Sequence, residues 1–464
     1  MHLFRRSGRA THMVRVHETR RWRRAVIAVT AVGGLAGTAC SAAAPSSFAS
    51  QSSHQAVANA TGASCPKVAN PVTNYLAYVC GKKGAANPKL SPVYIGVVNG
   101  AQGGASDVDV NASTAATMTI NFINQHLGGI DGHPLKEVFC AVPETVSGAT
   151  QCGQEMANNS KVHVVVVATA VTVGDEAFES ALAPTKKLLI LFAGGATDIH
   201  YKNALWLYGS GTSIEGPVAT FLKKYLHAKT VAMIGPTGPL TTLSFDAVIA
   251  GLKIEHIKYK TVTYDPSATD LTAPLEASGA ATASAIYATV SFTGCSDLEL
   301  SLKELNITRP VVDSGPLCIL PSVAAANGGK PLPWYSLIAS PLDSDKSDAS
   351  GAAYNRVAAE YGQSSLNSDN WMQSTMSEVL TAARFMNEVG PNGQSPAALQ
   401  KVAFAWHGPM MWGPPTTVCG TVKAAPQICT DEIQVFKPNS AGVFINESHG
   451  WIGPPAGVNI AAGT

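Results

Sequence analysis

Short apolar runs alternate with helical patterns along the chain from Val93 to Asp313. The first run, Val93–Val98, is β-branched, and the apolar positions after its small-residue loop recur at helical spacings of four, three and four. Gly128-Gly129 ends that helix, and a second strand is predicted at 135–140. A strand–helix–strand unit of this kind indicates an open α/β sheet, which holds ligands at the carboxyl ends of its strands.

The alternation continues and then restarts, which predicts an α/β fold of two doubly wound lobes. Further strands are predicted at 162–167, 188–192, 230–235, 259–264, 285–290, 310–313 and 334–339, with helices between them. Helical patterns around 350–361, 370–388 and 395–403 follow the second block. Because these helices follow the second block in the sequence, we expect the chain to cross back and complete the first lobe. Short strands are expected at 433–436 and 443–445.

The first 39 residues predict a secretory signal peptide. Eight arginines and Glu18 precede an uncharged, largely apolar stretch at 25–39, which is too short to span a bilayer. Removing these eight arginines and Glu18 from the totals of 32 basic and 31 acidic residues leaves 24 and 30, a net charge of −6. A chain that is acidic after its leader argues against a nucleic-acid partner.

Cys40 follows Gly37-Thr38-Ala39, which resembles the lipobox of bacterial lipoproteins. We expect lipidation of Cys40 and a tether after it, so that the protein is anchored by lipid to the outer face of the cell membrane. An ordinary secretory signal with a cysteine nearby by chance is the alternative, and it implies a secreted protein. The Arg20-Arg21 pair could indicate twin-arginine export, but the general route is favoured.

The other eight cysteines fall into four local pairs, a pattern typical of disulfides outside the cytoplasm. The pairs are Cys65 with Cys80, Cys140 with Cys152, Cys295 with Cys318, and Cys419 with Cys429. Eight cysteines allow about 105 connectivities, so the sequential pairing is a hypothesis. Zinc is the rival interpretation, but no Cys-x-x-Cys or His-x-x-x-His cluster supports a metal site, and no cofactor is expected.

Several motifs together carry a family resemblance. The strand, small-residue loop and helix at 95–124, the turn Gly128-Gly129-Ile130, the pair Gln151-Cys152 with Glu155, and the stretch 408–412 are its components. They resemble the extracytoplasmic solute-binding proteins of the branched-chain amino acid type, which have the type I periplasmic-binding-protein fold. The resemblance covers roughly residues 92–450.

This resemblance implies two lobes that close over a small solute, with three interlobe crossings near 211–216, 338–343 and 412–418. The expected first lobe is 91–213 plus 341–414, and the second is 214–340 plus 415–450. A tether with a small disulfide-closed extension is expected at 40–90, and a tail at 451–464. The implied partners are the solute and the membrane permease of an ABC transporter, and we expect a monomer.

By the same resemblance, ligand contacts come from loops at strand ends. In the first lobe these are Gln102, Val108, Thr169, Ala170, Thr172, Ala193, Gly194 and Thr197, and in the second Phe292, Asp313 and Ser314. Val108 stands where the family often has an aromatic residue. Leu317 stands where amino-acid binders typically carry the carboxylate for the ammonium group. Either Asp313 substitutes for that carboxylate, or the ligand is not an amino acid.

An enzyme needs a nucleophile or metal constellation, and no Gly-x-Ser-x-Gly, His-Glu-x-x-His or phosphate-loop motif is present. We therefore expect no catalytic residues and favour the binding lipoprotein of an importer. A ligand-sensing receptor without a transport role, or a secreted hydrolase, is the alternative.

Overall fold

The computed structural model describes residues 65–100, 107–143, 145–168, 174–191, 201–209, 214–342, 345, 348–364, 370–415, 419 and 426–458. Its helices and strands alternate as the apolar periodicity predicts, within a few residues at most boundaries. No helix among these residues combines the length and apolarity that crossing a membrane requires.

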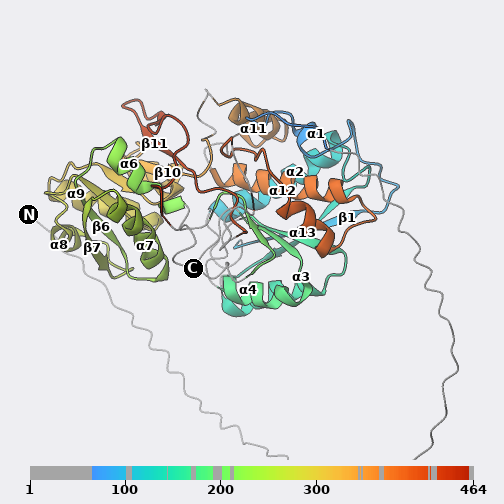
Figure 1. Ribbon diagram of the computed structural model, residues 1–464, viewed down its shortest axis with the longest axis horizontal. Helices are drawn as coiled ribbons and strands as arrows, with labels where there is room; N and C mark the ends of the chain where they lie inside the picture. The colour runs from blue at the N-terminus through green and yellow to red at the C-terminus, as the bar shows by residue number, and fades with distance from the viewer. Residues whose placement is uncertain are drawn as a thin grey trace, which may run out of the picture. The chain divides into compact units, whose positions relative to one another are not determined.

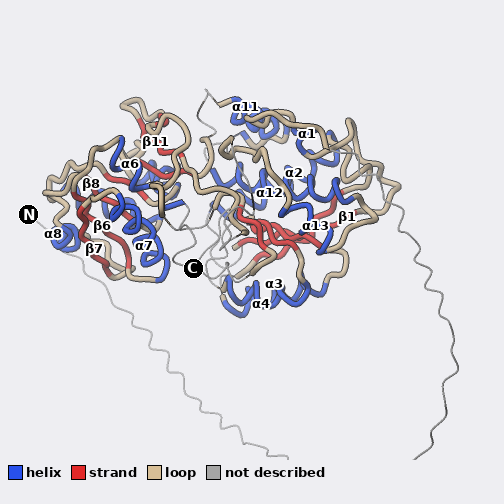
Figure 2. The backbone as a smooth tube through the Cα atoms, viewed as in Figure 1, coloured by secondary structure: helices blue, strands red, loops and turns tan. Residues whose placement is uncertain are grey.

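The first sheet, within the described residues, has five parallel strands. They are β1 (Val93–Asn99), β2 (Leu135–Ala141), β3 (Val162–Val167), β4 (Leu188–Leu191) and β5 (Ala204–Trp206), drawn red in Figure 2. Their order is β2-β1-β3-β4-β5, so it reverses between β1 and β3. Doubly wound sheets of this order bind ligands at that reversal, beyond the carboxyl ends of the strands.

Helices cover both faces of the first sheet (Figure 1). One face carries α2 (Asp107–His126), α11 (Ala349–Glu360), α12 (Asn370–Val389) and α13 (Pro396–Phe404), and the other carries α3 (Val146–Asn158) and α4 (Asp175–Leu182), which leads into the 3₁₀ turn η1 (Ala183–Thr185). Val164 and Val166 of β3 belong to the apolar cluster of the first face, and Val165 and Val167 to that of the second. A strand buried on both faces is apolar on both, which explains the four consecutive valines at 164–167. The late helices thus complete the first lobe.

The second sheet repeats the same order and adds two strands. It consists of β6 (Thr230–Pro236), β7 (Lys258–Tyr264), β8 (Ala285–Ala288), β9 (Val311–Asp313), β10 (Tyr335–Ile338), β11 (Gln434–Pro438) and β12 (Phe444–Asn446). The parallel part runs β7-β6-β8-β9-β10, with its reversal between β6 and β8, and β11 and β12 extend the other edge antiparallel. Ile433 and Ile452 also exchange two backbone hydrogen bonds, so the chain stays attached beyond the expected boundary at residue 450.

Helices also cover both faces of the second sheet. One face carries α6 (Val218–Lys224) and α7 (Pro239–Ile254), and the other carries α8 (Thr272–Ser278), α9 (Phe292–Glu304), the 3₁₀ turn η3 (Pro316–Ile319) and α10 (Pro321–Ala326). The two sheets therefore have the same doubly wound plan. The boundaries of the lobes, including the crossings between them, stay a prediction.

Residues 65–90 are more closely integrated than a tether. The short helix α1 (Tyr75–Tyr78) packs against α12, where Tyr78 is fully buried and its hydroxyl lies 2.8 Å from Thr381 Oγ1. Arg384 Nη1 donates to the backbone carbonyl of Tyr78 at 2.7 Å, and Asn387 Nδ2 donates to that of Val79 at 2.7 Å. The extension is therefore part of the first lobe's core.

The structure contains the four sequential disulfides, Cys65–Cys80, Cys140–Cys152, Cys295–Cys318 and Cys419–Cys429. We predict that the denatured, unreduced protein exposes no thiol, apart from that of Cys40 in protein produced without the lipid. Titration with a thiol reagent, with and without prior reduction, measures this directly. Two or more reactive thiols before reduction would contradict the pairing.

Candidate functional site

The carboxyl ends of β1 and β3 meet where the strand order of the first sheet reverses. Asn99, the last residue of β1, is fully buried, and its Nδ2 donates to the carbonyl of Asp109 at 2.9 Å. Ala168, just after β3, donates its backbone N–H to Val98 at 3.0 Å and accepts a hydrogen bond from Thr375 Oγ1 at 2.9 Å. These bonds fix the points from which two of the predicted ligand loops leave the sheet.

Most ligand residues predicted for the first lobe lie outside the described residues. These are Gln102, Thr169, Ala170, Thr172, Ala193, Gly194 and Thr197, and Cys40 lies outside them too. Val108 is described, in the first turn of α2, with 7% of its surface exposed. Its side chain can supply apolar contact but no hydrogen bond, and its role at the ligand stays a prediction.

Asp313 is the last residue of β9 and is 1% exposed. The backbone N–H groups of Cys318, Ser314 and Gly315, in the turn that follows the strand, favour the charged form of its carboxyl. Burial nevertheless raises the pKa of Asp313 to about 8, because the apolar surroundings disfavour its charged form. Asp313 Oδ2 has no hydrogen-bond partner among the described residues.

The other two residues predicted for the second lobe flank this position. Ser314 donates its backbone N–H to Ala288 at 3.0 Å, which joins the turn to the end of β8. Phe292 is the first residue of α9, whose N-cap Ser291 accepts from the backbone N–H of Gly294 at 3.3 Å. The predicted helix near 295–305 thus begins three residues earlier, because Ser291 caps it. The contribution of Phe292 stays a prediction.

A second buried carboxyl in the second lobe, Glu215, was not predicted from the sequence. Its Oε2 accepts a hydrogen bond from the hydroxyl of Tyr287, which also lies 2.5 Å from Ser244 Oγ. Burial, together with the charge of Asp313, raises the pKa of Glu215 to about 8, although its hydrogen bonds act in the opposite direction. Thr289 Oγ1, just beyond β8, is buried without a partner in the described part of the chain.

This group of residues, Glu215, Ser244, Tyr287, Thr289 and Asp313, will be called the acidic cluster. Within the described residues it includes two carboxyls and no ion-pair partner for either. Burial disfavours the ionised form of each carboxyl, and the charge of Asp313 adds to this effect at Glu215, so a proton or a bound cation stabilises them. The sequence held one signal for it, since a tyrosine inside an apolar strand needs a partner for its hydroxyl.

Glu378 is a third buried carboxyl, on α12 in the first lobe. It is fully buried, and neither of its carboxylate oxygens has a hydrogen-bond partner among the described residues. Burial alone raises its pKa well above the ordinary value, because the apolar surroundings disfavour the charged form. An ionised Glu378 would raise the pKa of Tyr208, whose hydroxyl donates to the carbonyl of Met411 at 2.8 Å.

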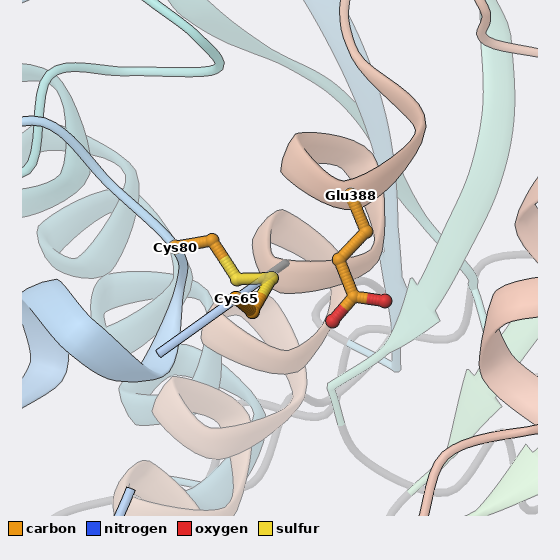
Figure 3. Close-up of side chains that lie close together, drawn as sticks. All are labelled: Cys65, Cys80 and Glu388. Atoms are coloured by element: carbon orange, nitrogen blue, oxygen red, sulfur yellow. A yellow bond between two sulfur atoms is a disulfide. The ribbon is translucent and has the colours of Figure 1, made fainter. Parts of the chain in front are cut away.

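Among the described residues, two groups of side chains have the spacing of a metal site, and both contain a disulfide. One is Cys65, Cys80 and Glu388, shown in Figure 3, and the other is Cys140, Cys152 and Glu155. A sulfur bound to another sulfur is not a thiolate, so each group offers only its glutamate as an anionic ligand. Arg384 Nε lies 2.9 Å from Glu388 Oε1 and already balances that charge.

Comparison with known proteins agrees with this fold. The family described as periplasmic binding protein matches residues 92–418. No protein of curated function matches the chain. Among solved structures, a leucine-binding protein of Thermotoga maritima is 14% identical, with a TM-score of 0.63, and the match covers 78% of this chain and 99% of that one.

Two further solved structures have comparable scores but different printed ligands. A fatty acid ABC transporter substrate-binding protein of Thermomonospora curvata is 12% identical, with a TM-score of 0.63 over 83% of this chain and 98% of its own. A solute-binding protein of an R. palustris ABC transporter, in complex with benzoate, is 13% identical, with a TM-score of 0.63 over 78% and 97%. The likeness shows the two-lobed type I fold, and the family match over most of the chain shows that it belongs to the periplasmic binding proteins.

Proposed function

We propose that this protein is the solute-binding component of an ABC importer and binds a small solute between its lobes by hinge closure. The observation that carries the proposal is the repeated strand order, which gives each sheet a reversal point at its carboxyl edge. Buried polar side chains end strands at these edges, Asn99 in the first sheet and Asp313 in the second, where doubly wound sheets hold their ligands. Membership of the periplasmic binding proteins supports the same function.

The acidic cluster favours a solute that carries an amine, such as an amino acid or a related compound. A positively charged group placed against Asp313 would offset the energy of burying its carboxyl. It would also give Asp313 Oδ2 the partner that it lacks among the described residues. Asp313 is thus proposed to replace the carboxylate that Leu317 does not supply.

The remaining parts of the proposal follow the sequence. Cys40 carries lipid, the protein is extracytoplasmic and anchored to the outer face of the cell membrane, and its macromolecular partner is a membrane permease. It acts as a monomer. Mass spectrometry of the protein from membranes tests the lipid on Cys40, and sedimentation tests the monomer.

Calorimetry against leucine, other aliphatic amino acids, amides, benzoate and a fatty acid tests the binding function, with X-ray scattering to follow closure. We expect one class of solute to bind and to reduce the radius of gyration. No binding by any of them, together with turnover of an ester or glycoside, would overturn the proposal.

We predict that Asp313→Asn weakens binding of an amine-bearing solute by roughly tenfold to a hundredfold, the range for losing a hydrogen bond to a charged group. Asp246→Asn is the matched control, because it makes the same chemical change on the exposed surface of α7. Calorimetry measures the affinity of both variants for the solute. Equal affinities in the two variants would exclude the role proposed for Asp313.

A further inference from the structure

A groove of about 480 Å³ lies in the first lobe between α2, β2 and the segment that follows α11. Its lining residues are Ser113, Thr114, Thr117, Met118, Asn121, Glu137, Phe139, Tyr361 and Gln363. The volume falls within the range of small-molecule sites. All three elements belong to the first lobe, so the groove does not depend on how the lobes close.

The strand side of this groove is formed by β2, the edge strand of the first sheet. Leu135, Glu137 and Phe139 alternate along β2 and therefore point to the same face, toward α2. Leu135 is 1% exposed and packs with the residues of α2, as that face requires. Glu137 and Phe139 continue the face with a carboxyl and with a ring that is 43% exposed. The open end of this face therefore presents a carboxyl and a ring to the groove.

The helix side of the groove is polar where it meets these residues. Ser113, Thr117 and Asn121 recur every four residues and so form one stripe along α2. Thr117 Oγ1 donates to Glu137 Oε2 at 3.2 Å. Ser113 Oγ already donates to the carbonyl of Asp109 at 3.0 Å, and Thr117 donates to Glu137, so the stripe offers the amide of Asn121 and the hydroxyl oxygens as acceptors.

The third wall is held in place by contacts at the end of α11. Tyr361 Oη donates to Gln125 Oε1 at 3.0 Å, and His126 Nε2 lies 2.8 Å from Glu360 Oε1. These contacts fix the backbone that carries Tyr361 and Gln363 beside α2. The groove is therefore formed before any ligand arrives.

The charge that the groove lining can carry is negative. Glu137 is the only ionisable acid or base in its lining apart from the phenol of Tyr361, and no ion pair to Glu137 occurs among the described residues. Burial raises the pKa of Glu137, although its hydrogen bond from Thr117 acts in the opposite direction. A half-buried carboxyl without a cation is stabilised when a positive charge binds beside it. An anionic ligand would be repelled.

We propose that this groove is a second binding site, separate from the interlobe solute site, for a small organic cation. Glu137 supplies the counter-charge, and the aromatic rings of Phe139 and Tyr361 contact the alkylammonium group. The polar stripe on α2 binds hydrogen-bonding substituents of the ligand. A neutral sugar could use the same hydroxyls and ring, but it would leave the buried carboxyl without a counter-charge.

Ligand-observed NMR at low ionic strength tests the proposal with four probes: choline, butylamine, glucose and acetate. We expect the two cations to bind and the neutral and anionic probes not to bind. Glu137→Gln should weaken the binding of both cations by roughly tenfold or more, and Phe139→Ala should weaken choline binding severalfold. Glu176→Gln, the same change at an exposed position of α4, should have no effect.

Hydrogen exchange with and without choline locates the bound probe. Protection is expected in 113–121 and 135–141, and not around the acidic cluster. Absence of binding by both cations would overturn the proposal. So would cation binding that Glu137→Gln leaves unchanged, glucose binding as tight as that of choline, or protection confined to the acidic cluster. The interlobe function is tested separately through Asp313, so failure of one proposal leaves the other standing.

Discussion

Tyr78→Ala is expected to lower the free energy of unfolding by about 3–5 kcal/mol, although the residue lies outside the region that matches the family. Tyr78 is fully buried against α12, and its ring, its hydroxyl and its backbone carbonyl all have partners there. Removing the side chain leaves a cavity in the core and exposes the end of the extension. Urea unfolding followed by circular dichroism measures the loss.

Two further variants separate the contribution of the Tyr78 hydroxyl from that of its ring and from the loss of any tyrosine. Tyr78→Phe keeps the ring but removes the hydroxyl that meets Thr381, and should cost about 1 kcal/mol. Tyr259→Ala, at a tyrosine that is 37% exposed on β7, should change stability far less than Tyr78→Ala. If Tyr78→Ala and Tyr259→Ala have equal effects, the extension is not part of the folded core.

The second large effect expected is a loss of stability as the pH rises from about 5 to about 8. Glu215 has an ordinary pKa of 4.5 that burial raises to about 8, so over this interval the folded state holds a proton that the unfolded chain releases. The stabilisation is fully present below pH 4.5 and is lost as the pH rises through about 8. Asp313 and Glu378 act in the same direction.

Glu215→Gln removes the part of the pH-dependent unfolding free energy that Glu215 contributes, which is on the order of a few kcal/mol. Glutamine keeps the shape and can still accept from Tyr287, but it does not titrate. The unfolding free energy of the variant should therefore fall less steeply between pH 5 and pH 8 than that of the parent protein. Denaturant titrations at several pH values give the slopes. Parallel slopes would show that Glu215 has the same pKa in both states.

The architecture was predictable because the spacing of apolar residues indicates which faces of helices and strands are buried. The valine run at 162–167 is β3, and the helical pattern at 370–388 is α12 to within one residue. Connections between parallel strands have few solutions, so restarted alternation was enough to predict two doubly wound lobes. The cysteine spacings likewise anticipated the four pairs, since each pair closes a short local loop.

The acidic cluster was predictable only in part, because it depends on contacts across long separations. Asp313 was identified from its place at a strand end, but Glu215 and Tyr287 meet across 72 residues. Periodicity places Tyr287 on one face of β8 without saying what its hydroxyl meets. The contact between Tyr78 and Thr381 spans 303 residues, so periodicity did not predict it either.

The Cys65–Cys80 bond also determines how mechanical tension enters the protein. A pull on the chain before Cys65 passes through the two sulfurs to Cys80 and bypasses α1, which lies between them. The load then reaches Gly81, Lys82 and Gly84, whose backbone N–H groups bond to Leu76, Leu127 and His126 at 2.9, 3.0 and 3.2 Å. Tension on a membrane tether would therefore be carried by the end of α2, while Tyr78 stays seated in the core.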